Sequence, residues 1–239
     1  MTRPALLDNV THRHLRVRTE RSAALGDARQ SALALPAEFR QLQAHFPIVF
    51  QHVDGGAGFQ PIVLLGLEEE QNLFLTEAGW DAPVVPMALQ RDPFMIGRGA
   101  EGLQLHVDLD SPRIVRPEEG EVGTAVFMPH GGHSDYLDHV VGLMEHLHAQ
   151  AQRLPAFIEA LTGHQLLEPF ALDIELSNGE QGRLAGLYTI HEERLAALHG
   201  AALEALQREG HLLPIYMQLA SLAQLPGLVE RANRRVAGG

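Results

Sequence analysis

The chain has 239 residues, of which 45% are hydrophobic, so it is long enough to bury a substantial core in one large domain. Its formal net charge of −12 opposes binding to a phosphate backbone, and we expect no nucleic acid partner. The sequence contains neither cysteine nor lysine, which excludes thiol nucleophiles, disulfides, thiolate metal ligands and Schiff-base lysines.

The N-terminal sequence lacks the apolar segment of a secretory signal. No apolar run approaches the ~20 residues that a membrane-spanning helix needs. We therefore expect a soluble, cytoplasmic protein without a membrane span.

Strand signals dominate the first half of the chain. Leu15 and Val17 alternate with arginines, which predicts an edge strand, and Pro36 begins a short predicted helix. Two apolar segments around a glycine-rich turn predict a hairpin over 46–66, and a further short strand is expected at 72–75.

The next strand of this half is expected within 103–115. Leu103, Leu105 and Val107 alternate with polar residues, which is typical of a half-buried strand, and Ser111-Pro112 breaks the pattern. This strand would present His106, Asp108 and Asp110 on one face, with Arg113 at its end.

Helix signals dominate the second half. A glycine- and proline-rich segment at 117–133 is expected to be mobile, and an amphipathic helix over 136–154 follows, with Ser134 as its cap. Strict alternation around Ser177-Asn-Gly179 predicts a second hairpin within 168–190. Two terminal helices are expected at 192–206 and 213–234.

These elements predict an α+β fold with mainly antiparallel pairing, because hairpins with short connections replace βαβ units. We expect a single domain over 1–239. It would subdivide into a strand-rich part at 1–116, a loose connection at 117–135, and a helix-rich part with one hairpin at 136–239.

Nine segments in a fixed order resemble the SapC protein family, and they extend over nearly the whole chain. They are Pro36-Ala-Glu-Phe-Arg40, His45-Phe-Pro-Ile-Val-Phe50, Asn72-Leu-Phe-Leu75, Gly79-Trp80, Arg91-Asp-Pro-Phe94, Asp108-Leu-Asp-Ser-Pro-Arg113, Leu167-Glu-Pro-Phe170, Gly186-Leu-Tyr-Thr-Ile190 and Pro214-Ile-Tyr-Met-Gln-Leu-Ala-Ser-Leu222.

The resemblance implies a soluble bacterial protein from a family named after a surface-layer-associated member. It also implies gene neighbourhoods that contain outer-membrane receptors, flavin-dependent halogenase-like enzymes and cupin-like oxygenases. It supplies no catalytic residues, and the peptide-transport permease that shares the name is unrelated. His130-Gly-Gly-His133 departs from the acidic turn usual in the family.

A metal site is the first chemical candidate. His106 and Asp108 lie two residues apart on a strand, so their side chains share a face at about 6.6 Å separation. A 2-His-1-carboxylate Fe(II) oxygenase of the cupin type uses this spacing, with Arg113 or Arg183 to hold a 2-oxo acid. The alternative is a solvated strand face that ends in a turn.

Other polar groups each have two interpretations. Trp80, Arg91 and Phe94 would line an apolar, anion-binding pocket, or else Trp80 would be ordinary core and Arg91 would form an ordinary ion pair with an acidic neighbour. The histidines within 130–148 would either bind a divalent metal or form a polar helix face beside a loop. Asp173 and Glu175 would be either paired catalytic carboxylates or a solvated sheet face.

Two functions follow. The first is an accessory protein that binds a small molecule or a protein partner, through the stretch 83–96 and the terminal helices. Its candidate ligand-binding residues are Trp80, Arg91, Phe94, Asp108, Asp110 and Arg113. The second is a metal-dependent oxygenase that uses His106 and Asp108 and an Fe(II) or other divalent cofactor.

Overall fold

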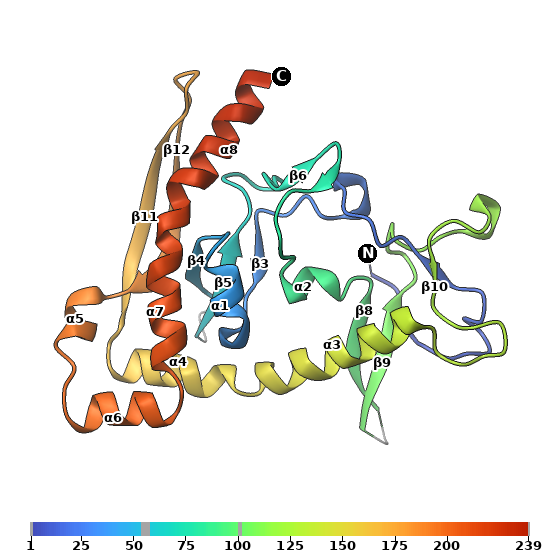
Figure 1. Ribbon diagram of the computed structural model, residues 1–239, viewed down its shortest axis with the longest axis horizontal. Helices are drawn as coiled ribbons and strands as arrows, with labels where there is room; N and C mark the ends of the chain where they lie inside the picture. The colour runs from blue at the N-terminus through green and yellow to red at the C-terminus, as the bar shows by residue number, and fades with distance from the viewer. Residues whose placement is uncertain (1, 54–57, 100–101, 239) are drawn as a thin grey trace. The chain divides into compact units, whose positions relative to one another are not determined.

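The computed structural model describes residues 2–53, 58–99 and 102–238 (Figure 1). Contacts divide the chain into two compact units, which are not consecutive blocks. Unit 1 comprises Met1–Ala28, Leu75–Trp80 and Met87–Ala149, and unit 2 comprises Arg29–Phe74, Asp81–Pro86 and Gln150–Gly239. The stretch 83–96 therefore contributes to both units. Antiparallel sheets and a helix-rich second half confirm the predicted α+β class.

Unit 1 is built on a three-stranded sheet. β9 (Gly102–Asp108) lies between β1 (Pro4–Leu6) and β8 (Phe94–Gly99), and both neighbours pair with it in antiparallel fashion. The predicted strand within 103–115 is thus central, but it ends at Asp108. The side chain of Asp108 accepts a hydrogen bond from the backbone N–H of Asp110, which turns the chain at that point.

Two short ribbons and two helices complete unit 1. β2 (Arg16–Val17), the predicted edge strand, pairs with β10 (Thr124–Ala125), and β6 (Leu75–Thr76) pairs with β7 (Gly79–Trp80). The short helix α2 (Met87–Gln90) precedes β8. The strand expected at 72–75 forms only at its end, because the buried Asn72 side chain accepts a hydrogen bond from the N–H of Phe74 and makes a turn.

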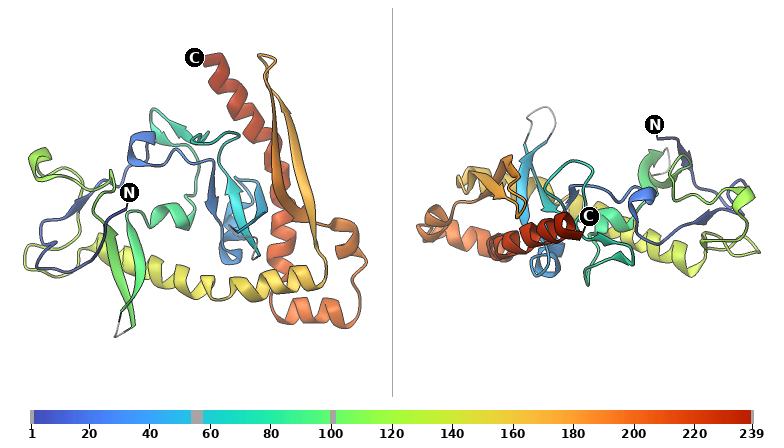
Figure 2. Two further views of the ribbon diagram at one scale, coloured as in Figure 1. Left: turned by 180° about the vertical axis from the view of Figure 1, so that it is seen from behind. Right: turned by 90° about the horizontal axis from the view of Figure 1, so that it is seen from above.

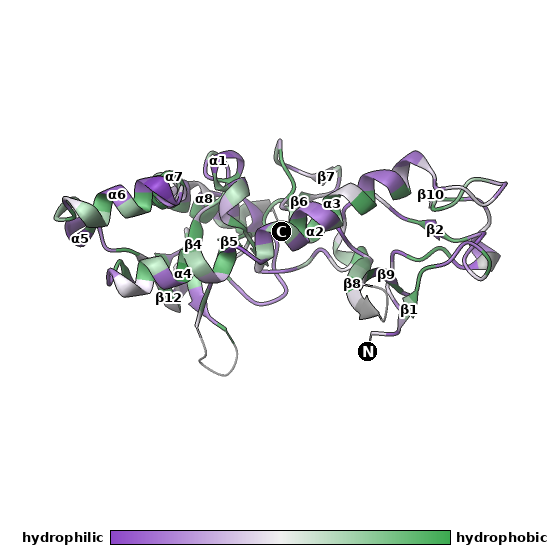
Figure 3. Ribbon diagram, turned by 90° about the horizontal axis from the view of Figure 1, so that it is seen from below, coloured by the Kyte–Doolittle hydropathy of each residue, from purple (hydrophilic) through white to green (hydrophobic). Residues whose placement is uncertain are grey.

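The long helix α3 (Asp135–Ala151) begins as predicted. Ser134 Oγ accepts a hydrogen bond from the N–H of Leu137 at 3.2 Å, and Asp135 and Asp138 lie in the first turn, where the helix dipole favours negative charge. Hydrophilic and hydrophobic bands alternate along this helix in Figure 3. Its buried face carries Leu137, Val140, Met144 and Leu147.

Unit 2 contains a five-stranded antiparallel sheet with the strand order β11-β12-β4-β5-β3. Both predicted hairpins are confirmed. β4 (Ile48–His52) and β5 (Phe59–Leu64) form the first, and β11 (Leu167–Glu175) and β12 (Gln181–Ile190) form the second and longer one (Figure 2). β3 (Ser31–Leu33) pairs with β5 at one edge.

The helices of unit 2 are shorter than the sequence indicated. They are the 3-10 helix η2 (Pro36–Glu38), α1 (Phe39–Leu42), α4 (Leu154–Gly163), α5 (Glu192–Ala196), α6 (Ala201–Arg208), α7 (Leu212–Ser221), the 3-10 helix η4 (Leu222–Gln224) and α8 (Leu225–Gly238). The helix expected over 192–206 is two helices, because Gly200 adopts a left-handed φ of 60°. The helix expected over 213–234 is interrupted by η4, so that Pro226 falls in the first turn of α8, where proline is tolerated.

Helix α7 is joined to the sheet by a buried amide. Gln218 is 0% exposed; its Nε2 donates to the carbonyl oxygen of Ile48 at 2.8 Å, and its Oε1 accepts from the N–H of Ile190 at 3.3 Å. β4 and β12 pair directly only at Leu187 and Tyr188, so the Gln218 amide supplies the hydrogen bonds that the diverging strands no longer exchange.

One helical stretch among the described residues, Leu212–Ala237, is long and apolar enough to cross a membrane by length and composition. This finding corrects the expectation that no segment passes that test. The core helix of a soluble protein passes it as well, and this stretch carries the buried Gln218 and Ser221, both bonded to Ile48. It therefore does not by itself indicate a membrane span.

Candidate functional site

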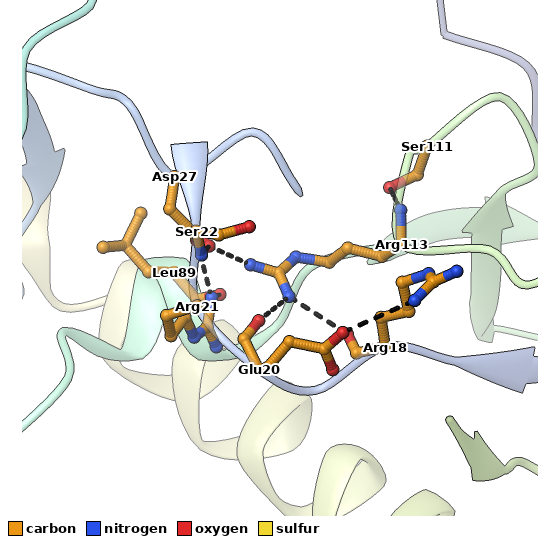
Figure 4. Close-up of polar contacts among 8 residues, drawn as sticks. All are labelled: Arg18, Glu20, Arg21, Ser22, Asp27, Leu89, Ser111 and Arg113. Carbon is orange, nitrogen blue, oxygen red and sulfur yellow. Dashed lines mark hydrogen bonds and ion pairs between the residues drawn. The ribbon is translucent and has the colours of Figure 1, made fainter. Parts of the chain in front are cut away.

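Arg113 and Asp27 form a buried ion pair in unit 1 (Figure 4). Their side chains are 2% and 1% exposed, and Arg113 Nη2 donates to Asp27 Oδ2 at 2.5 Å. Arg113 Nη1 also donates to the carbonyl oxygens of Arg18 and Glu20, at 3.0 and 2.9 Å. The guanidinium is thus enclosed by acceptors from its own unit.

Asp27 has further partners. Its Oδ1 accepts from Arg21 Nη1 at 3.0 Å, and its Oδ2 accepts from the N–H of Ser22, also at 3.0 Å. Arg21 Nη1 donates in addition to the carbonyl oxygen of Leu89. A buried carboxylate bonded by two guanidiniums and a backbone N–H meets the condition under which buried charge is tolerated. We regard this cluster as the structural centre of unit 1.

Among the described residues, Arg113 does not pair with the neighbouring Asp110. Asp110 lies instead beside Arg3, with Nε and Oδ1 3.2 Å apart and both side chains exposed. Asp108 Oδ1 accepts from the N–H groups of Arg3 and Asp110. Asp108 and Asp110 therefore shape the turn after β9, and Arg113 is not joined to them in one ligand site.

The predicted metal site at His106 and Asp108 has no third ligand among the described residues. His106 and Asp108 share a face of β9 as predicted, but no group of three His, Asp or Glu side chains with metal-binding geometry occurs within 2–53, 58–99 and 102–238. The His106 ring lies over Gly97, and its Nδ1 is 3.3 Å from the carbonyl oxygen of Gln104. The Fe(II) site stays a prediction without added support.

The other polar candidates lie in ordinary surroundings. His139 and His146 are exposed on α3, and His133 Nδ1 is 2.9 Å from Asp138 Oδ1. Asp173 is exposed beside Arg183, at 3.5 Å. These contacts favour the interpretation of the histidines as a polar helix face, and of Asp173 as part of a solvated sheet face.

Trp80, Arg91 and Phe94 are placed in unit 1. Phe94 is 1% exposed and its ring centroid is 6.1 Å from that of Tyr136, so it belongs to the core. Arg91 Nη1 donates to the carbonyl oxygen of Phe94 at 3.3 Å. Trp80 is half-buried on β7, opposite Leu75. The position of Phe94 favours the core over a pocket, whereas the choice between the two interpretations of Trp80 and Arg91 stays open.

Unit 2 contains a cavity that the sequence did not indicate. Its volume is about 370 Å³, within the range of small-molecule sites. Four separate segments line it: η2 and α1, the junction of α3 and α4, α4 itself, and the loop from α6 into α7. The lining residues are Pro36, Ala37, Arg40, Gln150, Arg153, Phe157, Glu209, Gly210, His211, Leu213, Pro214 and Met217.

The apolar part of this cavity is formed by a buried aromatic ring and the start of α7. Phe157 is 2% exposed and meets the His211 ring at 5.4 Å in an edge-on arrangement. Leu213, which also lines the cavity, is 51% exposed. The cavity thus has a ring at its base and an apolar residue open to solvent.

The polar part carries two cations. Arg40 and Arg153 are exposed, and within the described part of the chain no hydrogen bond or ion pair engages either guanidinium. A guanidinium presents a planar set of N–H donors that matches a carboxylate. These two groups are therefore the anion-binding elements that the cavity offers.

A histidine and a carboxylate lie beside them. His211 Nε2 is 3.4 Å from Glu209 Oε2, and the His211 side chain is 13% exposed. Burial lowers the pKa of His211 below its ordinary value, and the Glu209 carboxylate opposes this shift in part. His211 is therefore neutral at neutral pH, and its ring can donate or accept a hydrogen bond within the cavity.

This cavity was missed because its residues are dispersed along the sequence. Arg40, Arg153 and His211 follow no shared spacing, and each alone is an ordinary surface residue. The available signals were two segments that the family resemblance already singled out, Pro36-Ala-Glu-Phe-Arg40 and the one that begins at Pro214 and contains Met217.

Comparison with protein families identifies the chain. The SapC family model matches residues 7–228, nearly its whole length, and the chain belongs to the SapC family. No curated protein matches it, and no solved structure matches it.

Proposed function

We propose that this SapC-family protein is an accessory binding protein, and that unit 2 holds a small molecule with a carboxylate attached to an apolar body. One observation carries the proposal: a cavity of about 370 Å³ combines a buried phenyl ring with two guanidiniums that no described residue hydrogen-bonds or pairs with. Ligand sites of this kind are mostly apolar, with a few polar groups that fix orientation.

The two parts of the cavity define the two parts of the ligand. Arg40 and Arg153 would receive the carboxylate, while Phe157, Leu213 and Met217 would contact the apolar body. Neutral His211 adds one hydrogen-bonding group between them. A ligand with two charged ends fits less well, because the opposite side of the lining is apolar.

The lining favours binding over catalysis. Among the described residues that line the cavity there is no hydroxyl or thiol nucleophile. The oxygenase alternative concerns unit 1 and has two candidate ligands there, without a third among the described residues. We therefore propose the binding function and not the oxygenase.

The family context suggests where such a protein would act. Its relatives are expected near genes of surface layers and outer-membrane uptake, and an accessory protein that holds an imported or surface-derived acid would suit that setting. We propose the cytoplasm as its location, which cell fractionation would test.

A calorimetric titration tests the binding. We expect octanoate and 3-phenylpropionate to bind, and the matched neutral amides to bind at least about tenfold more weakly, because only the acids engage the guanidiniums. The double variant Arg40→Gln/Arg153→Gln should remove the preference, whereas Arg183→Gln, at an exposed arginine on the β11–β12 hairpin of unit 2, should leave it intact. Equal affinity for acid and amide would overturn the proposal.

A further inference from the structure

Unit 1 contains a second cavity, independent of the one above. Its volume is about 510 Å³, and it lies between the N-terminal segment and the loop that follows Val115. Four basic residues line it, namely Arg13, His14, Arg16 and Arg116. Glu121 is the one acidic residue among the described residues of the lining, so the local charge is positive in a chain whose net charge is −12.

Two of these arginines are held in place by backbone carbonyls. Arg16 Nε and Nη2 donate to the carbonyl oxygens of Val122 and Gly123, each at 2.9 Å. Arg13 Nη2 donates to that of Pro129 at 2.7 Å. A guanidinium has five N–H donors, so both keep donors for a ligand while their positions are fixed in advance.

The third arginine is unengaged through its side chain. Within the described residues the Arg116 guanidinium makes no hydrogen bond; its backbone N–H donates to Glu119 Oε2 at 2.7 Å, and its carbonyl oxygen accepts from the N–H of Glu119 at 3.0 Å. The other oxygen of Glu119 accepts from Arg18 Nη2, also at 2.7 Å. The nearby carboxylate is thus shared between Arg18 and the backbone of Arg116, and it offsets only part of the positive charge of the three arginines.

From this geometry we infer that unit 1 binds a compact polyanion, either a phosphorylated small molecule or a di- or tricarboxylate, between Arg13, Arg16 and Arg116. Three guanidiniums around one space suit a ligand with at least two negative charges. Leu15, Val115 and Phe127 complete the lining and leave room for a short apolar portion. A polymer is disfavoured, because the rest of the chain is acidic.

Ligand binding in this cavity would also restrain the loop at 117–133. The same arginines that would face the ligand hold the carbonyl oxygens of Val122, Gly123 and Pro129. A bound anion would fix these guanidiniums further, and opening of the loop would then require loss of the ligand contacts. Ligand binding and protection of 117–133 from proteolysis are therefore linked.

The test is calorimetric titration with pyrophosphate and with citrate at constant ionic strength. We expect at least one of them to bind, and Arg116→Gln to weaken that binding about tenfold or more. Arg116→Gln should fold normally, since its side chain makes no hydrogen bond within the described chain. Tighter binding of pyrophosphate would identify the phosphorylated class, and tighter binding of citrate the polycarboxylate class.

Two further variants test whether binding depends on the charge of the cavity. Glu121→Gln should tighten binding several-fold, because it removes a like charge from the cavity, and Arg208→Gln in unit 2 should leave it unchanged. The tighter of the two anions should also slow cleavage within 117–133 by a glutamyl endopeptidase, for which Glu118 and Glu119 are sites, in the parent and not in Arg116→Gln. Absence of binding by both anions, or affinity equal in the parent, Arg116→Gln and Glu121→Gln, would overturn the inference.

Discussion

Arg113 donates a hydrogen bond to Asp27 across 86 positions of sequence, and both side chains are almost fully buried. The contact fixes the turn after β9 against the segment that follows β2. Burial of two charges costs several kcal/mol for each ion, which only near-complete hydrogen bonding offsets. Arg113 and Asp27 meet that condition together with Arg21 and the backbone of Arg18, Glu20 and Ser22.

Removal of one partner should therefore destabilise the protein strongly. We expect Arg113→Ala and Asp27→Ala each to lower the free energy of unfolding by about 3–5 kcal/mol, because each removes one partner of a buried ion pair. Urea denaturation measures the change. The control is Arg3→Ala, which removes the exposed contact with Asp110 and should cost about 0–1 kcal/mol. Equal effects of the buried and the exposed substitution would refute the structural role.

The buried amide of α7 supports a second stability prediction. Gln218→Leu keeps the volume but leaves the carbonyl oxygen of Ile48 and the N–H of Ile190 without that partner. We expect a loss of about 1–3 kcal/mol for each buried group left unsatisfied. Gln207→Leu on the exposed face of α6 is the matched control and should change the unfolding midpoint little. An unfolding midpoint unaffected by Gln218→Leu would show that β4 and β12 do not need the amide of Gln218 for their stability.

His211 should make the stability of unit 2 depend on pH. Its pKa in the folded protein is lowered by burial, so between its ordinary value of 6.5 and the folded value the unfolded chain binds the proton and the folded chain does not. The contribution is thus fully present above pH 6.5 and is lost as pH falls through the folded pKa. We expect His211→Gln to reduce the decline in stability between pH 7 and pH 5, as measured by denaturation at each pH. An identical decline in parent and variant would contradict the assignment.

The loop at 117–133 was expected from its composition to be mobile, and the structure adds what restrains it. Arg16 donates to the carbonyl oxygens of Val122 and Gly123, and the N–H of Met128 donates to the carbonyl oxygen of Gly132 at 2.7 Å. We expect limited proteolysis to cut first within this loop, and Arg16→Gln to accelerate the cut several-fold. Arg153→Gln serves as the control. First cleavage outside the loop in the parent protein would contradict this expectation.

The local features of the fold could be predicted from the sequence. Alternation and turn residues located the hairpin of β11 and β12, and Ser134 with Asp135 located the start of α3, because each signal lies within a few residues of the element that it specifies. The break at Gly200 was missed, since a glycine within an amphipathic pattern does not reveal its φ angle.

The long-range relationships could not be predicted in this way. The sequence placed Arg113 only at the end of a strand that carries Asp108 and Asp110, whereas its partner, Asp27, is brought near only by the fold. The cavity of unit 2 likewise assembles Arg40, Arg153 and His211 from segments that share no local pattern. Family membership, in contrast, was predictable, because it depends on many short segments in order.

The central claim is that the cavity beside Phe157 binds an apolar carboxylate, and the Met217 methyl group is a direct probe of that claim. Met217 lines this cavity, whereas Met128 lies in the loop of unit 1. In a titration followed by methyl NMR of the methionines, we predict that octanoate shifts the Met217 signal and leaves that of Met128 unchanged. Octanamide at the same concentrations should shift Met217 far less, and Arg40→Gln/Arg153→Gln should abolish the difference between the two ligands. A Met217 signal that does not move with octanoate, or that moves equally with octanamide, would contradict the proposed binding function.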